Sequence, residues 1–430
     1  MRRLPTIRVR RLRGTISDRA TLGWVIFDFA TVMFAINIAG LYFPLWVVED
    51  AGGRDAHVAI ALSSAMLIIL IGAPLLGSFA DRSGKRTFML GWTVTVCAGL
   101  TLLIGHGGLT TSLILFALAA AANGCGLIFY DALLPVVSTP TDRGRISGFG
   151  IAAGFVGSIV GISTGAAILA IDSESKPLVF KVTALLFVLG ALPCLLWVRE
   201  PPRVSIAARP PLRDDLRWTW RLTHEVPGMR RFLAGRVLYT DATNTIFAFM
   251  SVYAVKEVGF SETQTQLVLL SGIIAGPIGA LVAGRATDRF GPQATIKRLL
   301  WLWLAVLILS AFIPLGDLPR GLFWAVAPFA GFAFGGTSTV DRALLLTLAP
   351  SDHAGRFFGV FAMVGRLSAV FGPLLWALIV EVLDLGRPAA VLSLALMVVV
   401  ARFVFRGLSD TNLAARPTAG PLSTPKGQIA

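Results

Sequence analysis

The chain has 430 residues and a net charge of +14, and it is 55% hydrophobic and only 14% charged, with a mean hydropathy of +0.75. Soluble globular proteins carry about 25% charged residues, so this composition excludes an ordinary soluble domain and indicates a protein built for lipid. Most of the 38 Lys and Arg fall in alternate loops on the side of the N-terminus. This positive-inside pattern argues against a nucleic-acid partner and predicts a plasma (inner) membrane protein with both termini in the cytoplasm.

Apolar runs of about 20 residues, long enough to cross a bilayer, recur along the whole chain. They cover residues 21–48, 58–80, 88–105, 111–138, 146–170, 179–198, 233–256, 264–284, 295–314, 321–348, 357–382 and 388–405. These runs predict an all-α integral membrane protein with twelve transmembrane helices.

One polar break divides the runs into two groups of six. The predicted organisation is a basic cytoplasmic N-terminus (1–20), an N-terminal six-helix bundle (21–198), a cytoplasmic linker (199–232), a C-terminal six-helix bundle (233–405) and a disordered cytoplasmic tail (406–430). The opening MRRLPTIRVRRLRG has no small-residue cleavage site of a signal peptide. Within the linker, DDLRWTWRL (214–222) is predicted to form a short amphipathic helix at the membrane surface.

Three short sequences occur once in each half, in the same order. GSFADRSGKRT is matched by GRATDRFGPQAT, DALLPVVSTP by DRALLLTLAP, and GRISGFG by GRFFGVF. In the first pair the matched residues are Gly77, Asp81, Arg82 and Gly84 with Gly284, Asp288, Arg289 and Gly291. The shared order predicts duplication of a six-helix unit, with the copies related by an axis along the membrane normal.

The first of these motifs has a physical rationale. Gly77 allows neighbouring backbones to approach, and Gly84 permits a sharp turn. Asp81 can accept hydrogen bonds from a helix N-terminus or from a basic partner across the cytoplasmic face, while Lys85 and Arg86 are positive-inside anchors. The alternative is an ordinary tight loop with solvated charges, which the second copy at the predicted place disfavours.

The segment GSFADRSGKR resembles the loop signature of the major facilitator superfamily, and the resemblance extends over nearly the whole chain, from Leu22 to Phe405. It implies two pseudo-symmetric six-helix bundles around a central cavity that is lined by the first and fourth helices of each half. The second copy has Pro292 and Gln293 in place of the basic pair. This departure weakens the prediction that the second loop gates as the first one does.

The segments GWVIFDFATVMFA, FPLWV and FYDALLPVVSTPTDRGRISGFGIAAGFVG carry a narrower resemblance, to the vacuolar amino-acid effluxers of fungal autophagy and their bacterial relatives. That family typically has Asn where this chain has Thr31, so a side-chain amide beside Asp28 is missing. The resemblance implies an amino acid as the substrate.

Four acidic residues lie inside the predicted spans, in the first and fourth helices of each half: Asp28, Asp131, Asp241 and Asp341. At 1.5 Å per residue they form a layer in the cytoplasmic third of the membrane, where a charge has to be paired or functional. Two compatible roles stay open. One is a gate formed by pairing with Arg236, Arg342 or Arg145, and the other is coupling to H⁺ or Na⁺.

Coupling needs a carboxylate whose partner changes with conformation, because burial disfavours the charged form and a nearby Arg favours it. The intramembrane cations Arg236, Arg342 and Arg366 all belong to the C-terminal half. We therefore predict that Asp28 or Asp131 lacks a permanent partner.

Arg366 lies near the middle of its helix, where an isolated cation is costly. It is either an anchor for a substrate carboxylate or phosphate, or a structural partner of Asp241 or Asp341. Further polar candidates, each equally consistent with substrate binding and with an interhelical tie, are Asn123, Asn244, Thr337 and Ser338.

Other chemistry is not indicated. Cys97, Cys125 and Cys194 lie in apolar runs without metal-ligand spacing, so neither a metal site nor a disulfide is predicted. The chain lacks a catalytic set and the phosphate-binding pattern GxxxxGK[ST], so neither an enzyme nor a bound cofactor is expected.

The combined prediction is a secondary active transporter that works as a monomer. It moves a small polar solute, an amino acid or related metabolite, by alternating access, with coupling to H⁺ or Na⁺ through the buried Asp residues. The alternatives are a cation-coupled sugar symporter, a multidrug efflux protein, and a non-transporting membrane sensor or scaffold.

Overall fold

A computed structural model describes most of the chain. The described residues are 18–172, 176–201, 217, 220–221, 223–316, 318–349, 353–367 and 371–407. The predictions for the extreme N-terminus, for most of the linker with its amphipathic helix, and for the C-terminal tail lie outside these residues.

The first half of the chain forms helices throughout. Its elements are α1 (Arg19–Phe34), the π-helix η1 (Ala35–Tyr42), α2 (Phe43–Glu49), α3 (Asp55–Ser83), α4 (Arg86–Leu102), α5 (Gly108–Asp131), α6 (Leu134–Val137), α7 (Arg143–Ile171) and α8 (Lys176–Trp197).

The second half is also helical. Its elements are α10 (Met229–Lys256), α11 (Glu262–Phe290), α12 (Pro292–Leu315), η2 (Arg320–Leu322), α13 (Phe323–Leu348), α14 (Ala354–Leu367), α15 (Phe371–Ala377), η4 (Leu378–Val382), α16 (Gly386–Val404) and η5 (Phe405–Gly407). The described residues contain no strand.

Each predicted apolar run corresponds to a helix or to a chain of consecutive helices. Among the described residues, nine helical segments are long and apolar enough to cross a membrane. The remaining three runs form α4, which is only 17 residues long, and α10 and α13, which contain charged residues. The run 111–138 is interrupted after Asp131, because α6 begins with Pro135 near its N-terminus, and proline cannot continue a helical hydrogen-bond ladder.

The π-helical segment η1 widens the first span and is not visible in the apolar pattern. It ends just before Pro44, which lies in the first turn of α2. Because proline has no amide hydrogen, the carbonyl one turn earlier loses its normal partner, and such positions commonly kink or widen a helix.

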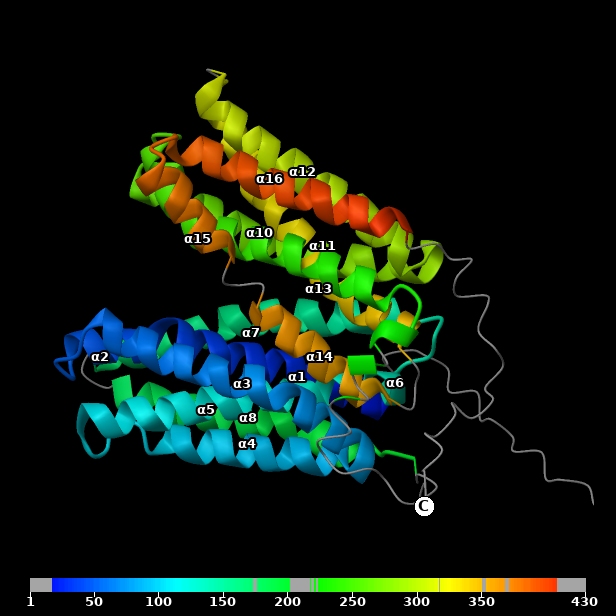
Figure 1. The fold of residues 1–430 in the computed structure, drawn as a ribbon. Coiled ribbons are helices and arrows are strands. Elements are labelled where there is room, and N and C mark those ends of the chain that lie inside the picture. Colours follow the sequence, from blue (N-terminus) through cyan, green and yellow to red (C-terminus); the bar gives the residue numbers. More distant parts are fainter. Residues whose placement is uncertain are drawn as a thin grey trace, which may run out of the picture.

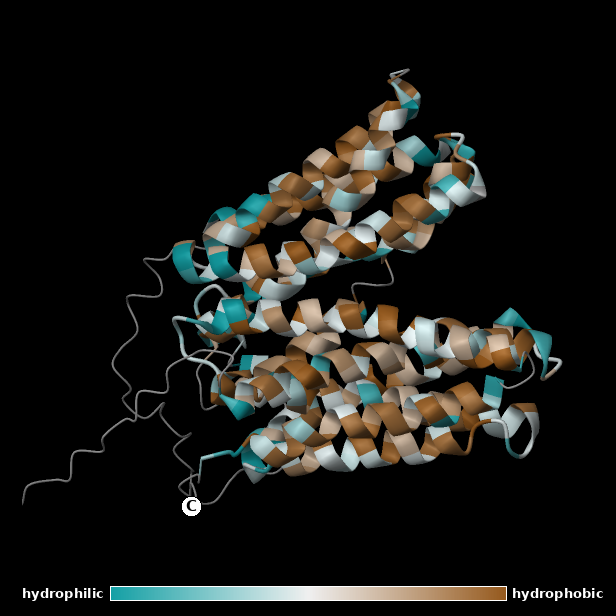
Figure 2. Ribbon diagram, turned by 180° about the vertical axis from the view of Figure 1, so that it is seen from behind, coloured by the Kyte–Doolittle hydropathy of each residue, from teal (hydrophilic) through white to brown (hydrophobic). Residues whose placement is uncertain are grey.

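The helices form two bundles whose axes converge at one end of the molecule and diverge at the other (Figure 1). The converging end carries α6 and the loops between α3 and α4 and between α11 and α12, and we call it the motif end. Polar residues gather at the two ends of the helices, whereas hydrophobic residues cover their middle parts (Figure 2). Large apolar side chains such as Phe88, Trp92 and Leu185 are exposed on the outer helices, as expected where lipid replaces water.

α14 departs from a simple two-bundle arrangement. It packs far more extensively against α3, in the first half, than against α10 in its own half. The other extensive contact between the halves is α7 against α11, and smaller contacts join α7 to α13 and α14 to α5. The pairs α3–α14 and α7–α11 are therefore the two largest contacts between the halves.

Within the second half, α11 and α13 approach through glycines. A Cβ atom added at Gly279, Gly331 or Gly335 would collide with backbone of the facing helix. Small residues at crossings of this kind let helix backbones come close in a membrane, where van der Waals packing replaces the hydrophobic effect.

This crossing can be tested at Gly279, where an added methyl group would overlap the carbonyl group of Phe332. We expect Gly279→Ala to lower the free energy of unfolding by about 1–3 kcal/mol, measured by thermal unfolding of the purified protein in detergent. Gly99→Ala in α4 is the matched control, because nothing lies within 4 Å of the added atom. Equal losses in both variants would contradict close packing of α11 on α13.

Candidate functional site

The carboxylate of the first loop motif holds a helix of the opposite half. Asp81 lies in the last turns of α3 and accepts hydrogen bonds from the backbone N–H groups of Gly355 (2.9 Å) and Arg356 (2.8 Å), at the start of α14. It also forms a buried ion pair of 2.6 Å with Arg86. The predicted acceptor role of Asp81 is confirmed for both kinds of partner.

The second copy of the motif makes the equivalent backbone contact. Asp288, near the end of α11, accepts hydrogen bonds from the backbone N–H groups of Gly144 (2.8 Å) and Arg145 (3.0 Å), at the start of α7. A carboxylate at a helix N-terminus satisfies amides without an intrahelical partner and interacts favourably with the helix dipole. The departure of the second copy from the motif therefore leaves this contact intact.

The two copies differ in what surrounds the carboxylate. Arg86 donates from Nη1 to the carbonyl oxygen of Ala132 (2.8 Å) as well as pairing with Asp81. Gln293 occupies the repeat-related position, is 4% exposed, and its amide nitrogen has no hydrogen-bond partner. The first motif thus joins α3 and α14 to α4 and to the C-terminal end of α5, whereas Asp288 joins α11 to α7.

The remaining motif residues have local roles. Gly84 ends α3 in the left-handed region with φ of 61°, and Gly291 has φ of 83° at the junction of α11 and α12, as predicted for sharp turns. Lys85 is exposed, Arg82 is half-buried, and the Arg289 guanidinium lies 5.2 Å from the ring centroid of Phe290.

Glycines bring the two halves together at the same places. A Cβ atom at Gly77 would collide with the carbonyl oxygen of Gly355, and one at Gly144 would lie 2.7 Å from the carbonyl oxygen of Gly284. All four glycines belong to the repeated motifs, so the duplicated sequence encodes both crossings between the halves.

A second connection between the halves lies deeper in the membrane. Arg342 in α13 donates to Asp28 in α1, with Nη1 2.7 Å from Oδ2, and its Nε atom lies 2.9 Å from Oδ1 of Asp131 at the end of α5. The second contact is close but not aligned as a hydrogen bond. Two carboxylates of the N-terminal half therefore share one cation of the C-terminal half.

Two aromatic side chains wall this ion-pair cluster. Trp24 and Tyr130 stack with centroids 4.5 Å apart, and each donates a 3.1 Å hydrogen bond to the other's backbone carbonyl. The Arg342 guanidinium lies 5.6 Å and 5.5 Å from their ring centroids. This packing excludes solvent, and Asp28 is only 2% exposed.

The second cluster lies wholly within the C-terminal half. Arg236 in α10 pairs with Asp341 in α13 at 3.0 Å, and the Tyr239 hydroxyl donates to the other oxygen of the same carboxylate. Arg236 also donates to the carbonyl oxygen of Phe361 (3.1 Å) and stacks on its ring.

In this conformation the carboxylates predicted to lack a permanent partner both have one. Asp28 and Asp131 both pair with Arg342, because that side chain crosses to the N-terminal half. Among the described residues no side chain pairs with Asp241, which is 0% exposed and lies against the backbone of Gly372. Arg145, the third cation considered for a gate, contributes its backbone amide to Asp288.

Arg366 is a half-buried cation without an acidic partner among the described residues. Neither Asp241 nor Asp341 pairs with it, so the predicted structural pair is not formed within this part of the chain. It lies at the end of α14 and points toward the first half, where its Nη2 atom would be 3.4 Å from a Cβ atom placed at Gly124 in α5. Arg366 therefore lies between the halves.

The other polar candidates divide into two groups. Asn123 in α5 accepts a 2.8 Å hydrogen bond from the Thr31 hydroxyl in α1, so the Thr that replaces the family's Asn has its own polar partner. Thr337 donates to carbonyl groups of its own helix. Asn244 and Ser338 are half-buried.

Sequence reasoning missed the aromatic partners of the ion pairs. Trp24 lies one helical turn before Asp28, and Tyr130 immediately precedes Asp131, so spacing could have indicated both. Tyr239 gives no such signal, because its partner is 102 residues away in the sequence.

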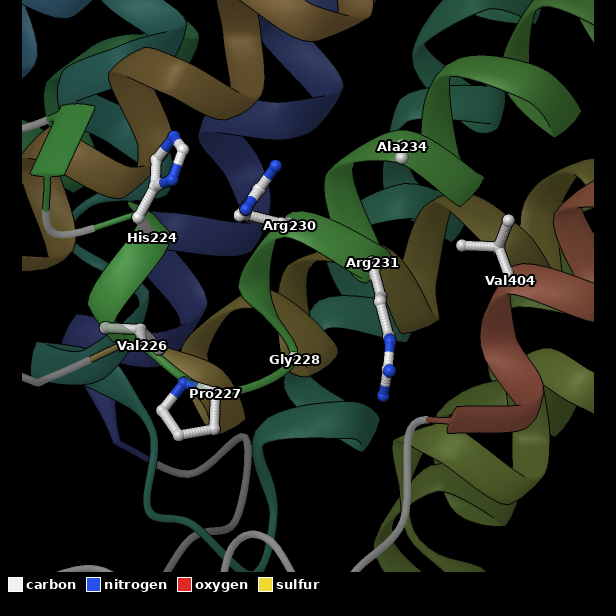
Figure 3. A pocket seen from close by; sticks show the side chains of 8 residues that line it. All are labelled: His224, Val226, Pro227, Gly228, Arg230, Arg231, Ala234 and Val404. Carbon is white, nitrogen blue, oxygen red and sulfur yellow. The ribbon is translucent and has the colours of Figure 1, made fainter.

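No metal centre accompanies these groups. The described residues contain no cluster of three His, Cys, Asp or Glu side chains that could hold a metal ion. A separate pocket of about 440 Å³ lies at the motif end beside the start of α10, lined by His224, Arg230, Arg231 and apolar residues (Figure 3). It contains none of the predicted site residues.

Two repeated helical halves, joined at one end through a repeated motif and carrying charged groups between them, define a membrane transporter rather than an enzyme. The profile of the Major Facilitator Superfamily matches residues 26–373 and 232–420, and the chain belongs to that family.

Individual relatives agree with this assignment. The uncharacterized MFS-type transporter YxiO of Bacillus subtilis (strain 168) is 23% identical over 88% of this chain and 92% of its own length. Autophagy-related protein 22-1 of Aspergillus fumigatus is 25% identical over 57% of this chain and 45% of its own length. The crystal structure of the human organic anion transporter MFSD10 superposes with a TM-score of 0.71 at 16% identity, covering 90% of this chain and 99% of that one. The fold, the family and the transporter class are thus established.

We call the hydrogen bonds of Asp81 to the start of α14 and of Asp288 to the start of α7 the two latches. Loss of the Asp81 carboxylate is expected to separate the halves more than loss of the Asp288 carboxylate. We expect Asp81→Asn to separate spin labels at Lys85→Cys and Phe290→Cys more than Asp288→Asn does. Each substitution weakens charge-assisted hydrogen bonds worth about 1.5–3 kcal/mol, and Asp81→Asn also removes the partner of Arg86. Pulsed electron resonance distances measure the separation.

Asp55→Asn is the control, since Asp55 is exposed at the opposite end of α3. Unchanged distances in both motif variants would show that the carboxylates do not hold the halves together.

Proposed function

We propose that this protein is an alternating-access carrier for a small polar solute with an anionic group, with amino acids as the first candidates, and that a proton gradient drives it. The observation that carries the proposal is Arg366, a half-buried cation at the boundary between the halves whose charge no described acidic side chain offsets. A substrate carboxylate would provide the missing partner.

The contacts between the halves suggest how the carrier rocks. The latches of Asp81 and Asp288 and the bridge of Arg342 all join one half to the other, and all lie toward the motif end. Breaking them together would open that end, whereas keeping them holds it closed. The excess of Lys and Arg in the loops on this side supports a cytoplasmic location for the motif end.

The polar groups near Arg366 suit a small ligand. Arg366 approaches α5 at Gly124, next to Asn123, which in turn binds Thr31 of α1. A substrate there would contact both halves at once, as required of a ligand whose binding changes their relative position. The family resemblance to amino-acid effluxers favours an amino acid among small carboxylates.

Uptake into proteoliposomes tests the substrate class. With a pH gradient imposed, we expect labelled amino acids to accumulate above equilibrium and labelled sugars not to, and accumulation to collapse when the gradient is dissipated. Uptake of sugars without uptake of amino acids would contradict the proposed substrate and support the alternative of a sugar symporter. Flux of neither pool from folded protein would leave the amino-acid assignment untenable.

Arg366→Gln tests the anion anchor. Losing one charge-assisted contact, worth about 1.5–3 kcal/mol, should raise the apparent KM for amino acids about 10- to 100-fold, and Arg366→Lys should recover part of the loss. Arg285→Gln is the matched control, because Arg285 also lies in a span but is exposed on α11. An unchanged KM for Arg366→Gln would show that the cation does not bind substrate.

A further inference from the structure

Asp241 lies in an apolar, tightly closed part of the C-terminal half. It occupies the middle of α10, and a Cβ atom added at Gly372 of α15 would lie 2.9 Å from its Oδ1 atom. The same added atom would collide with the hydroxyl oxygen of Thr245. Gly372 is thus required for α15 to cover these two side chains.

Thr245 shares the isolation of Asp241. The two residues are four apart on one helix and therefore face the same side, and both are 0% exposed. Among the described residues, no side chain forms a hydrogen bond with the Thr245 hydroxyl or with either carboxylate oxygen. Three buried polar oxygen atoms without a side-chain partner at one place form a site that is incomplete as it stands.

The charged groups around Asp241 are already engaged elsewhere or lie without contact to it. On α10, Arg236 and Tyr239 bind Asp341 of α13. Charged residues on the other helices packed against α10 are Arg285, Asp288 and Arg289 on α11, Arg342 on α13, Arg356 and Arg366 on α14, Arg387 and Arg402 on α16, and Arg406 on η5. None of them pairs with either oxygen of Asp241.

We propose that Asp241 and Thr245 form the proton-binding site of the carrier, in which Asp241 takes up one proton and the resulting carboxylic acid donates its hydrogen bond to the Thr245 hydroxyl. An uncompensated buried charge is costly, so the neutral carboxyl group is the form that these surroundings accommodate. The other carboxylates differ because an arginine lies within ion-pair distance of each: Arg236 pairs with Asp341, and Asp28 and Asp131 share Arg342.

A metal cation fits the site less well than a proton. Na⁺ would need several oxygen ligands, whereas the described residues offer one carboxylate and one hydroxyl here. A proton needs one acceptor and one hydrogen-bond partner, which is what Asp241 and Thr245 provide.

The site is connected to the proposed substrate anchor by a short piece of chain. Gly372, which covers Asp241, follows Arg366 by six residues, a separation of at most about 22 Å. The role of this proton in transport rests on the function proposed above, but binding of the proton does not.

Infrared spectroscopy of the purified protein in liposomes tests proton binding without any substrate. We expect the C=O stretch of a protonated carboxyl group at neutral pH, its loss at alkaline pH, and its complete loss at neutral pH in Asp241→Asn. The band should persist in Asp131→Asn. A band that Asp131→Asn removes and Asp241→Asn retains would overturn the proposal, as would absence of the band at all pH values.

Two threonines of α10 provide a matched pair for the hydrogen bond. Thr245→Val should shift loss of the band to lower pH, since the protonated form loses its acceptor. Thr243→Val should leave it unchanged, because the Thr243 hydroxyl already donates to the carbonyl oxygen of Thr240. A shift to higher pH in Thr245→Val would mean that the hydroxyl donates to the carboxylate, against the proposal.

Transport provides the second readout. Asp241→Asn should lose accumulation driven by a pH gradient but retain counterflow of substrate, because Asn resembles the neutral carboxyl group and exchange needs no net proton movement. Retained accumulation, or accumulation that follows a Na⁺ gradient, would overturn the coupling role. If the unmodified protein shows the infrared band but does not transport amino acids, the substrate assignment is wrong and the proton-binding site is unaffected.

Discussion

Asp81 and Asp288 each hold the first turn of a helix that belongs to the other half of the molecule, and much of the structure depends on this exchange. Both carboxylates accept two backbone N–H groups that no intrahelical carbonyl could satisfy, so each half completes a helix end in its partner. The short approach needs glycine on both sides of each crossing, and Gly77, Gly144, Gly284 and Gly355 supply it. The repeated motif is therefore a device for joining two copies of one six-helix unit.

Arg342 adds a second connection that depends on the first. Its guanidinium reaches Asp28 and Asp131 only because the motif end brings α13 next to α1 and α5, and separation of the halves would leave two buried carboxylates without their shared cation. Breaking a buried pair is costly for this reason, about 3–5 kcal/mol when one partner is lost. The bridge therefore favours the closed motif end strongly, unless water enters as the halves separate.

How far the sequence predicts this structure follows from the range of each interaction. Helix positions, the duplication and the acceptor role of Asp81 depend on local spacing and on a repeated motif, so they could be read from residues near one another in the chain. Pairing of Arg342 with Asp28 spans 314 residues and depends on which way one long side chain turns between two halves. The prediction for Asp28 or Asp131 assumed that arginines of the C-terminal half would pair within that half. In the structure Arg342 pairs across the halves, and among the described residues Asp241 has no arginine partner. The π-helix before Pro44 was not predicted for a different reason, because the hydropathy of a segment carries no information about its helical pitch.

The free energy needed to change the conformation of the carrier can be compared with what each ligand contributes by binding. To move an equilibrium from 99:1 in favour of one state to 99:1 in favour of the other takes a difference in binding free energy of about 5.5 kcal/mol. A single charge-assisted contact, about 1.5–3 kcal/mol, is too weak to supply that difference alone. A substrate carboxylate at Arg366 and a proton at Asp241 could supply it together, since each would bind a charged group that no oppositely charged side chain among the described residues pairs with. Arg366 and Asp241 both belong to the C-terminal half. If each ligand supplies only part of the required free energy, the halves move only when both ligands are bound.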